Sequence, residues 1–128
     1  MADTEKITMN MSVVDLGQID LLVKEGFYSN RTDFIRTAIR DLLNTHADVV
    51  KESVTRQSFV TGVLLYNSSD LEQRHLKGIR LNIKILGMFI LDPEVTPELA
   101  LATIESIEVH GVFRASEEVK KALIGRIK

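Results

Sequence analysis

The sequence predicts an α+β protein, with one strand and two helices at the N-terminus and a part of alternating strands and helices after them. Residues 5–11, EKITMNM, alternate between polar and apolar side chains, and this alternation is typical of a half-buried strand. Residues 12–45 carry apolar side chains at helical spacing. Three later segments each run from an apolar stretch through a glycine to a helix start.

Length and composition describe a chain that can fold around a core. The 128 residues include 45% hydrophobic and 27% charged side chains and no cysteine, which excludes disulfides, thiolate metal sites and a cysteine nucleophile. The N-terminal residues MADTEK lack the basic and apolar regions of a signal peptide. No apolar run approaches the ~20 residues of a membrane helix, so we expect a cytoplasmic protein without a membrane partner.

Two helices are predicted in the N-terminal part. The first begins at Ser12, with an acidic residue three positions later, and ends at Gly26. The second begins at Ser29 or Asn30 and has Asp33 in its first turn. A wide apolar stripe makes this second helix the strongest in the sequence. The stripe consists of Phe34, Ile35, Ala38, Ile39, Leu42 and Leu43.

The rest of the chain is predicted to form a separate domain. Residues 51–58 are polar and are interpreted as a linker or as an extension of the second helix, so the predicted domains are residues 1–50 and 59–128. Three glycines recur at spacings of 25 and 24 residues, and periods of this size indicate stacked supersecondary units. The glycines are Gly62, Gly87 and Gly111, and the predicted helix caps are Ser68 or Ser69, Thr96 before Pro97, and Ser116.

The isolated strand at residues 5–11 indicates that the chain associates with a second copy. One strand and two helices cannot bury this much apolar surface, and an unpaired strand exposes its backbone groups. Two such strands can pair antiparallel about a two-fold axis, with four helices closing over them. The side chains that would face the shared core are Ile7, Met9 and Met11, and those that would face away are Lys6, Thr8 and Asn10.

The N-terminal part resembles a known DNA-binding domain. Residues 6–43, KITMNMSVVDLGQIDLLVKEGFYSNRTDFIRTAIRDLL, resemble the ribbon-helix-helix class that includes the Arc, MetJ and CopG repressors. The segment GFYSNRTDFIRTAIR is similar to the pattern at the start of the family's second helix: Gly, aromatic, Ser/Asn, Arg-Ser/Thr-Glu/Asp, apolar, Ile-Arg. The resemblance covers residues 5–45. It implies a domain that dimerises through an intermolecular antiparallel β-ribbon, followed here by a small C-terminal β/α repeat domain.

This resemblance implies a sequence-specific transcriptional regulator, by class a repressor, that binds double-stranded DNA as a homodimer or higher oligomer. A two-stranded ribbon fits the major groove, where base edges can be read, and a helix N-terminus attracts phosphate. The implied base contacts are Lys6, Thr8 and Asn10. The implied phosphate contacts are Ser29, Asn30, Arg31 and Thr32. The implied dimer core is Ile7, Met9, Met11, Phe34, Ile35, Ala38 and Ile39.

The charge distribution predicts a modest electrostatic contribution to DNA binding. Residues 1–50 contain five Lys or Arg against eight Asp or Glu, whereas DNA-binding domains usually carry a basic excess. The predicted ribbon has a single basic residue, Lys6, next to Glu5. We therefore expect affinity to depend on several dimers bound side by side. A protein bound to DNA in this way is expected to be associated with the nucleoid.

Other functions have less support in the sequence. His46, His75 and His110 are not at metal-ligand spacing, and a nickel regulator of this class would carry a clustered His/Cys set, so we expect no metal or cofactor. No catalytic motif is present, so we expect no enzyme. Two alternatives stay open: a self-assembling protein that organises DNA, and an antitoxin whose tail binds a toxin. A small-molecule effector is not identified.

Overall fold

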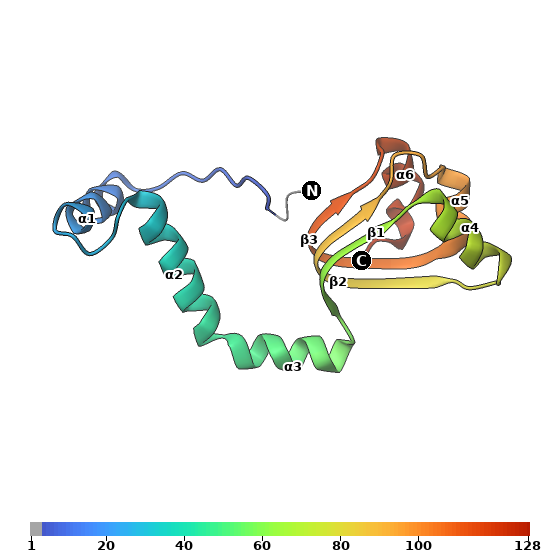
Figure 1. Cartoon of the computed structure of the whole chain (residues 1–128), viewed down its shortest axis with the longest axis horizontal. Helices are drawn as coiled ribbons and strands as arrows, with labels where there is room; N and C mark the ends of the chain where they lie inside the picture. The colour runs from blue at the N-terminus through green and yellow to red at the C-terminus, as the bar shows by residue number, and fades with distance from the viewer. Residues whose placement is uncertain (1–3) are drawn as a thin grey trace. The chain divides into compact units, whose positions relative to one another are not determined.

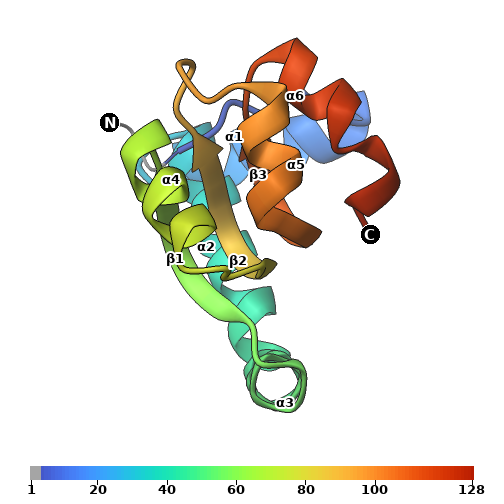
Figure 2. The ribbon, with the colours of Figure 1, turned by 90° about the vertical axis from the view of Figure 1, so that its right-hand side faces the viewer.

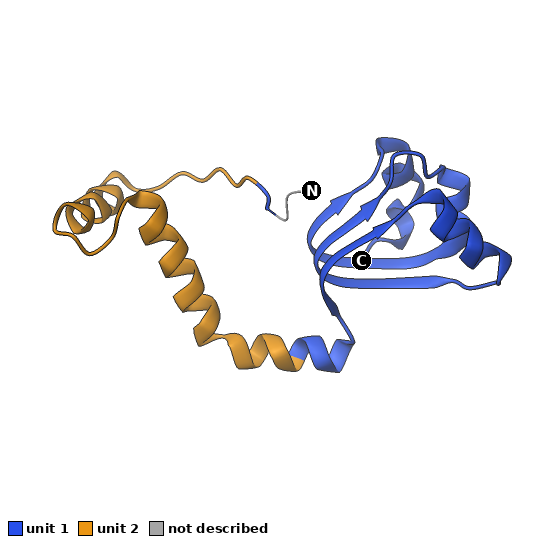
Figure 3. Ribbon diagram, in the orientation of Figure 1, with its two compact units in different colours: residues 1–5, 53–128 blue, residues 6–52 orange. Residues whose placement is uncertain are grey.

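The computed structural model describes residues 4–128 of the chain. These residues form two compact units, residues 6–52 and residues 53–128 together with Thr4 and Glu5, as Figure 3 shows. The first unit is helical, and the second is built on a small parallel β-sheet. The α+β class predicted from the sequence is confirmed.

The first helix, α1 (Val13–Lys24), begins and ends where the sequence predicts. The Ser12 hydroxyl accepts a hydrogen bond from the backbone N–H of Asp15 at 3.4 Å, which satisfies one free amide of the first turn. Gly26 follows the helix with a φ of +88°, a conformation that glycine adopts without steric cost. The cap at Ser12 and the stop at Gly26 each depend on residues close in the sequence, so the bounds of α1 can be predicted from the sequence alone.

The second helix, α2 (Arg31–Thr45), is capped by Asn30. The side-chain oxygen of Asn30 accepts from the backbone N–H of Asp33 at 2.8 Å. A third helix, α3 (Ala47–Gln57), follows directly. His46 separates the two helices with a backbone at φ −102° and ψ 11°. Most of residues 51–58 therefore lie in α3, a helix that begins two residues after α2 ends.

Residues 5–11 form no regular secondary structure in the single chain. A strand is defined by its hydrogen bonds to a neighbouring strand, and the predicted neighbour belongs to a second copy. The ribbon is therefore a feature that one chain alone cannot display, and it stays a prediction.

The second unit contains three parallel strands in the spatial order β1, β2, β3. A helix follows each strand, and α4, α5 and α6 lie on the same face of the sheet (Figure 2). A short 3-10 turn follows α6. The bounds are β1 Val60–Tyr66, α4 Ser68–Leu76, β2 Leu81–Leu91, α5 Pro97–Thr103, β3 Ile104–Arg114, α6 Glu117–Ala122 and the turn Ile124–Arg126.

The cap of α4 corrects one sequence prediction. Asn67 is the N-cap, and neither Ser68 nor Ser69 is. Its side-chain oxygen accepts from the backbone N–H of Asp70 at 2.8 Å, and its own N–H donates to the Asp70 carboxylate at 3.1 Å. This reciprocal arrangement satisfies two backbone donors at once, which favours Asn67 over its serine neighbours. The predicted caps of α5 and α6, Thr96 and Ser116, are confirmed.

A row of three glycines crosses the sheet. Gly62 pairs with Gly87, and Gly87 pairs with Gly111. Their φ values lie between +130° and +141°, and a Cβ atom at Gly87 or Gly111 would overlap the backbone carbonyl of the preceding glycine in the row. Side chains are therefore excluded from these two positions. Strands β2 and β3 also bend midway along their length (Figure 1).

The hydrophobic core of the second unit lies between the sheet and its helices. Phe89 of β2 is fully buried and stacks on Phe113 of β3, with ring centroids 5.4 Å apart. Each helix contributes one fully or almost fully buried residue to this core: Leu71, Ala100 and Val119.

No helix in the described part of the chain combines the length and the apolar character that crossing a membrane would require.

Candidate DNA interface

The N-terminal segment exposes both of its faces in the single chain. Lys6, Thr8 and Asn10, the predicted base contacts, are all exposed. The apolar residues between them are exposed as well: Ile7 is 82% and Met9 66% exposed. Alternating side chains in an extended segment point to opposite sides. The segment therefore presents alternating polar and apolar side chains, and among the described residues Ile7 and Met9 stay largely uncovered, whereas Met11 is half-buried.

The apolar stripe of α2 is also largely uncovered. None of the α2 residues is buried, and Leu42 and Leu43 are 62% and 60% exposed. Of the predicted dimer core, Phe34 and Ile35 are half-buried, whereas Ala38 and Ile39 are exposed. A unit of this size needs more buried apolar surface than its own contacts provide.

A groove with a partly apolar lining lies between the N-terminal segment and the two helices. It has a volume of about 480 Å³ and includes Met9, Met11, Ile19, Leu22 and Phe34 in its lining. Ile19, in this lining, is the one buried hydrophobic residue among residues 6–52. Three lining residues, Met9, Met11 and Phe34, belong to the predicted shared core, whereas Asn10, a predicted base contact, also lines the groove. The apolar part of the groove can accept apolar side chains from another molecule.

The turn between α1 and α2 brings the predicted phosphate contacts together. Ser29, Asn30, Arg31 and Thr32 are all exposed there. The backbone amides of the first helical residues have no intrahelical acceptor, and the positive end of the helix dipole lies at the same place. Asp33 occupies part of this site, because its carboxylate accepts from the Ser29 N–H at 2.9 Å.

Arg31, one of these predicted phosphate contacts, already has an anionic partner. Its guanidinium donates two hydrogen bonds to the Asp20 carboxylate of α1, at 2.7 and 2.8 Å. This hydrogen-bonded ion pair lowers the pKa of Asp20 and raises the pKa of Arg31. Asp20 is therefore charged at neutral pH and competes with phosphate for Arg31. Sequence analysis missed Asp20, because the two residues lie on different helices and only the helix pairing brings them together.

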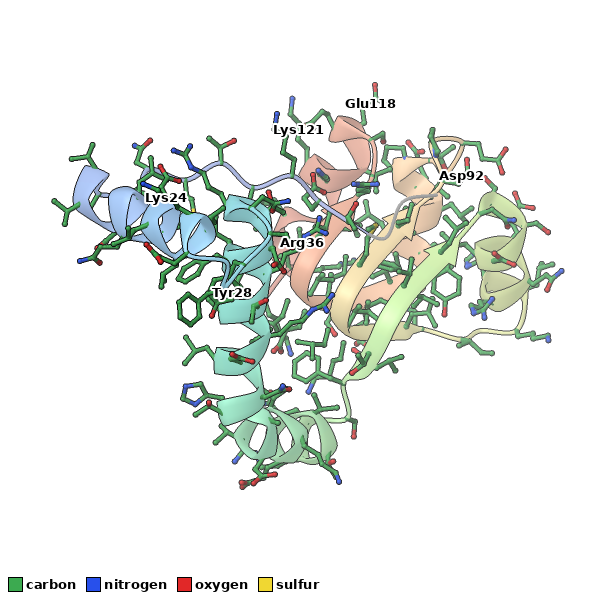
Figure 4. The ribbon with its side chains drawn as sticks, turned by 60° about the vertical axis from the view of Figure 1, so that its left-hand side comes forward. Lys24, Tyr28, Arg36, Asp92, Glu118 and Lys121 are labelled. Carbon is green, nitrogen blue, oxygen red and sulfur yellow. The ribbon has the colours of Figure 1, made fainter. Side chains whose placement is uncertain are left out.

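An aromatic contact orders the same turn. The rings of Tyr28 and Phe34 meet edge to face, with centroids 5.0 Å apart, and Tyr28 lies beside the start of α2 in Figure 4. Lys24 in the last turn of α1 and Arg36 on α2 are exposed cations near this turn in the sequence. The candidate interface therefore has a turn ordered by an aromatic contact, with two exposed cations close to it in the sequence.

The sequence of residues 2–120 matches the ribbon-helix-helix transcriptional regulator family. The chain belongs to this family. The match extends well beyond residues 5–45, where the resemblance is visible by eye, and includes most of the β-sheet unit. Membership of a family of transcriptional regulators supports a DNA-binding regulator.

Two curated relatives match parts of the chain. An uncharacterized protein of Methanocaldococcus jannaschii is 44% identical over 39 residues, which are 30% of this chain and 40% of that protein. A protein of Methanococcus aeolicus, named "Putative nickel-responsive regulator", is 27% identical over 74 residues, which are 58% of this chain and 52% of that protein. The chain thus spans about half or less of the length of these relatives. No solved structure is significantly similar to it.

Proposed function

We propose that the protein is a homodimeric transcriptional regulator, acting as a repressor, that reads DNA with a ribbon formed by residues 5–11 of two chains. The observation that carries this proposal is the two-sided exposure of the N-terminal segment. Polar Lys6, Thr8 and Asn10 alternate with exposed Ile7 and Met9. Pairing two such segments buries one side and leaves the other to enter the major groove.

The roles of the polar side chains follow from their chemistry. Lys6 can donate to guanine, Asn10 can pair with adenine through two hydrogen bonds, and Thr8 can bond a base or contact a thymine methyl group. The α2 entry, Ser29 to Thr32, would hold a phosphate and fix the register of the ribbon. Bound at a promoter in this way, the dimer would block transcription, which places its site of action at the nucleoid.

A gel-shift experiment with the DNA upstream of the chain's own gene tests the proposal. At low salt the wild-type protein should bind this DNA more tightly than unrelated DNA of equal length. Asn10→Ala should reduce this preference, typically by about 1–3 kcal/mol for a lost base contact, with little change in non-specific binding. Asn44→Ala, at an exposed position of α2, is the matched control and should leave the preference intact. A folded dimer without any sequence preference would contradict the proposal.

A nickel effector, which the name of the Methanococcus aeolicus relative raises, does not fit the residues of one chain. Ni²⁺ takes several nitrogen, oxygen or sulfur donors in a defined geometry. The chain has no cysteine, and among residues 4–128 no three metal-binding side chains lie together. His110 and Glu108 are in contact at 3.1 Å but provide only two donors. The proposed function therefore includes no nickel-dependent step.

The C-terminal unit is proposed to assemble ribbon dimers on DNA. This unit has its own core and a sheet whose β1 edge pairs only with β2 among the described residues. Assembly would compensate for the small number of cations in the ribbon, because neighbouring dimers on one DNA molecule add their binding energies. The same observation favours the second candidate, a DNA-organising protein, over an antitoxin, whose toxin-binding tail would not require such a folded unit.

A further inference from the structure

The two edges of the β-sheet differ in how they are protected. β1, with the sequence VTGVLLY, contains no charged residue and no proline. β3, at the opposite edge, carries Glu105, Glu108, His110 and Arg114. Natural proteins prevent unwanted strand pairing by charged side chains on an edge or by covering it. By this criterion the β3 edge is protected and the β1 edge is open to pairing.

The β3 edge is also partly covered by the end of the chain. Ile127 pairs with Ile107 of β3, and the backbone N–H of Lys128 donates to the Ile107 carbonyl at 2.7 Å. Thr4 and Glu5 lie near Thr61, Gly62 and Val63 on one face of the sheet, but no strand in the described residues pairs with the outer edge of β1, since β2 is its sole strand partner there. The difference in charge and the difference in strand pairing therefore both indicate that β1 is the edge open to pairing.

Apolar surface flanks β1 on both faces of the sheet. On one face Val63 and Leu65 are 47% and 46% exposed. On the other face lies a groove of about 400 Å³, whose lining includes Val60, Leu64 and Tyr66. Because strand side chains alternate between the faces, a strand added beside β1 would cover apolar surface on both faces.

We propose that β1 pairs antiparallel with β1 of a second copy and that this pairing joins two ribbon dimers into a tetramer. A strand that pairs with itself about a two-fold axis makes a closed, self-complementary contact. Pairing of β1 with β3 of another copy would instead place an apolar edge against a charged, partly covered one. The inference rests on the proposed assembly role of the C-terminal unit. It specifies β1 as the contact surface, a second copy of the chain as the partner, and a two-fold axis that closes the assembly at four chains.

A pair of matched substitutions tests the contact in the full-length protein. Val63, Met88 and Val112 form one row across the sheet, with Val63 on β1 and Val112 on β3. Val63→Lys places a charge on the open edge, where the side chain can still reach water. Sedimentation equilibrium should give four chains for the wild type, two for Val63→Lys and four for Val112→Lys. A wild type of two chains at all concentrations, or an equal effect of both substitutions, would overturn the proposal.

Disulfide cross-linking gives a second measurement that does not depend on a destabilising change. Because the chain has no cysteine, Val63→Cys introduces a single thiol at the middle residue of β1. If the two strands pair along their full length, this residue lies at the two-fold axis, where antiparallel Cα atoms are close enough for a disulfide. Mild oxidation should link Val63→Cys chains in pairs and leave Val112→Cys chains unlinked. Links that form only between Val63→Cys and Val112→Cys chains would show head-to-tail pairing and refute the two-fold contact.

The outcomes separate this inference from the proposed DNA-binding function. If Val63→Lys forms dimers that still prefer the promoter DNA, assembly and DNA reading are independent, as we expect. If the wild type forms tetramers but shows no sequence preference, the regulatory function fails and the edge contact stands. If the promoter preference is present without any tetramer, the edge contact fails alone.

Discussion

Replacement of Ile7 by alanine should weaken the ribbon dimer strongly. Ile7 is 82% exposed in the single chain and would move into the shared core when two segments pair. Burying one isoleucine side chain contributes about 1.5–3 kcal/mol, and the two-fold axis doubles this to about 3–6 kcal/mol per dimer. Since about 1.4 kcal/mol corresponds to a tenfold change in affinity, the dissociation constant should rise by about 10²- to 10⁴-fold.

Sedimentation equilibrium over a range of protein concentrations measures this effect. The comparison is cleanest in the Val63→Lys background, where the proposed β1 contact is removed. Leu76→Ala is the control, because Leu76 on α4 is 85% exposed and has no predicted interface role. If Ile7→Ala in the Val63→Lys background dissociates at the same concentration as Val63→Lys alone, Ile7 does not lie in a shared core. The same conclusion follows if Leu76→Ala weakens the dimer as much as Ile7→Ala does.

Three further changes have defined outcomes. Gly87→Ala should lower the free energy of unfolding, measured by heat or denaturant, by about 1–3 kcal/mol or more. Its Cβ would overlap the Gly62 carbonyl, and the φ of +141° at this position is unfavourable for alanine. Asp20→Asn should free Arg31 for phosphate, raising DNA affinity and steepening the plot of log K against log salt by about 0.9 per phosphate gained. Asn67→Ala should remove the α4 cap and cost about 0.5–2 kcal/mol of stability.

Each of these changes has a matched control. Gly17→Ala lies within α1 with open space around it and should stabilise by about 0.5–1 kcal/mol. Asp41→Asn makes the same charge change as Asp20→Asn at an exposed site of α2 without releasing Arg31. Ser69→Ala lies beside the cap of α4 and should have a much smaller effect than Asn67→Ala. Equal effects within any pair would contradict the contact assigned to it.

The effect of Asp20→Asn should not depend on pH near neutrality. The folded protein lowers the pKa of Asp20, so the contribution of its ion pair is present above the ordinary aspartate pKa and is lost only as the pH falls through the lowered value. The ratio of DNA affinities of variant and wild type should therefore stay constant between about pH 6 and 8. A marked change in this range would indicate that another titrating group controls Arg31.

Local signals predicted most helix starts in this protein. The caps Ser12, Asn30, Thr96 and Ser116 act on amides within the next few residues, so the sequence around each contains the information needed. Asn67 was missed because three adjacent residues are all able to cap a helix. Asn67 is the residue directly after the end of β1. Where a strand ends depends on contacts with residues distant in the sequence, so the capping residue could not be chosen from the local sequence.

Long-range geometry supplied the features that the sequence did not reveal. The spacing of Gly62, Gly87 and Gly111 predicted a repeat, but only the strand register shows that a side chain at Gly87 would collide with the neighbouring strand. The ion pair of Arg31 with Asp20 likewise joins two helices. The unequal protection of the sheet edges becomes visible only when β1 and β3 are known to lie at the edges.

Genome-wide recovery of the DNA bound to the wild type and to Asn10→Ala tests most directly that paired N-terminal segments read DNA. For the wild type we expect a limited set of enriched sites with a two-fold-symmetric sequence motif, including promoter regions. Asn10→Ala should stay folded and bound to DNA but lose or change the motif at the symmetric positions. No enriched sites for the wild type, or an identical motif for Asn10→Ala, would contradict the ribbon as the element that reads DNA.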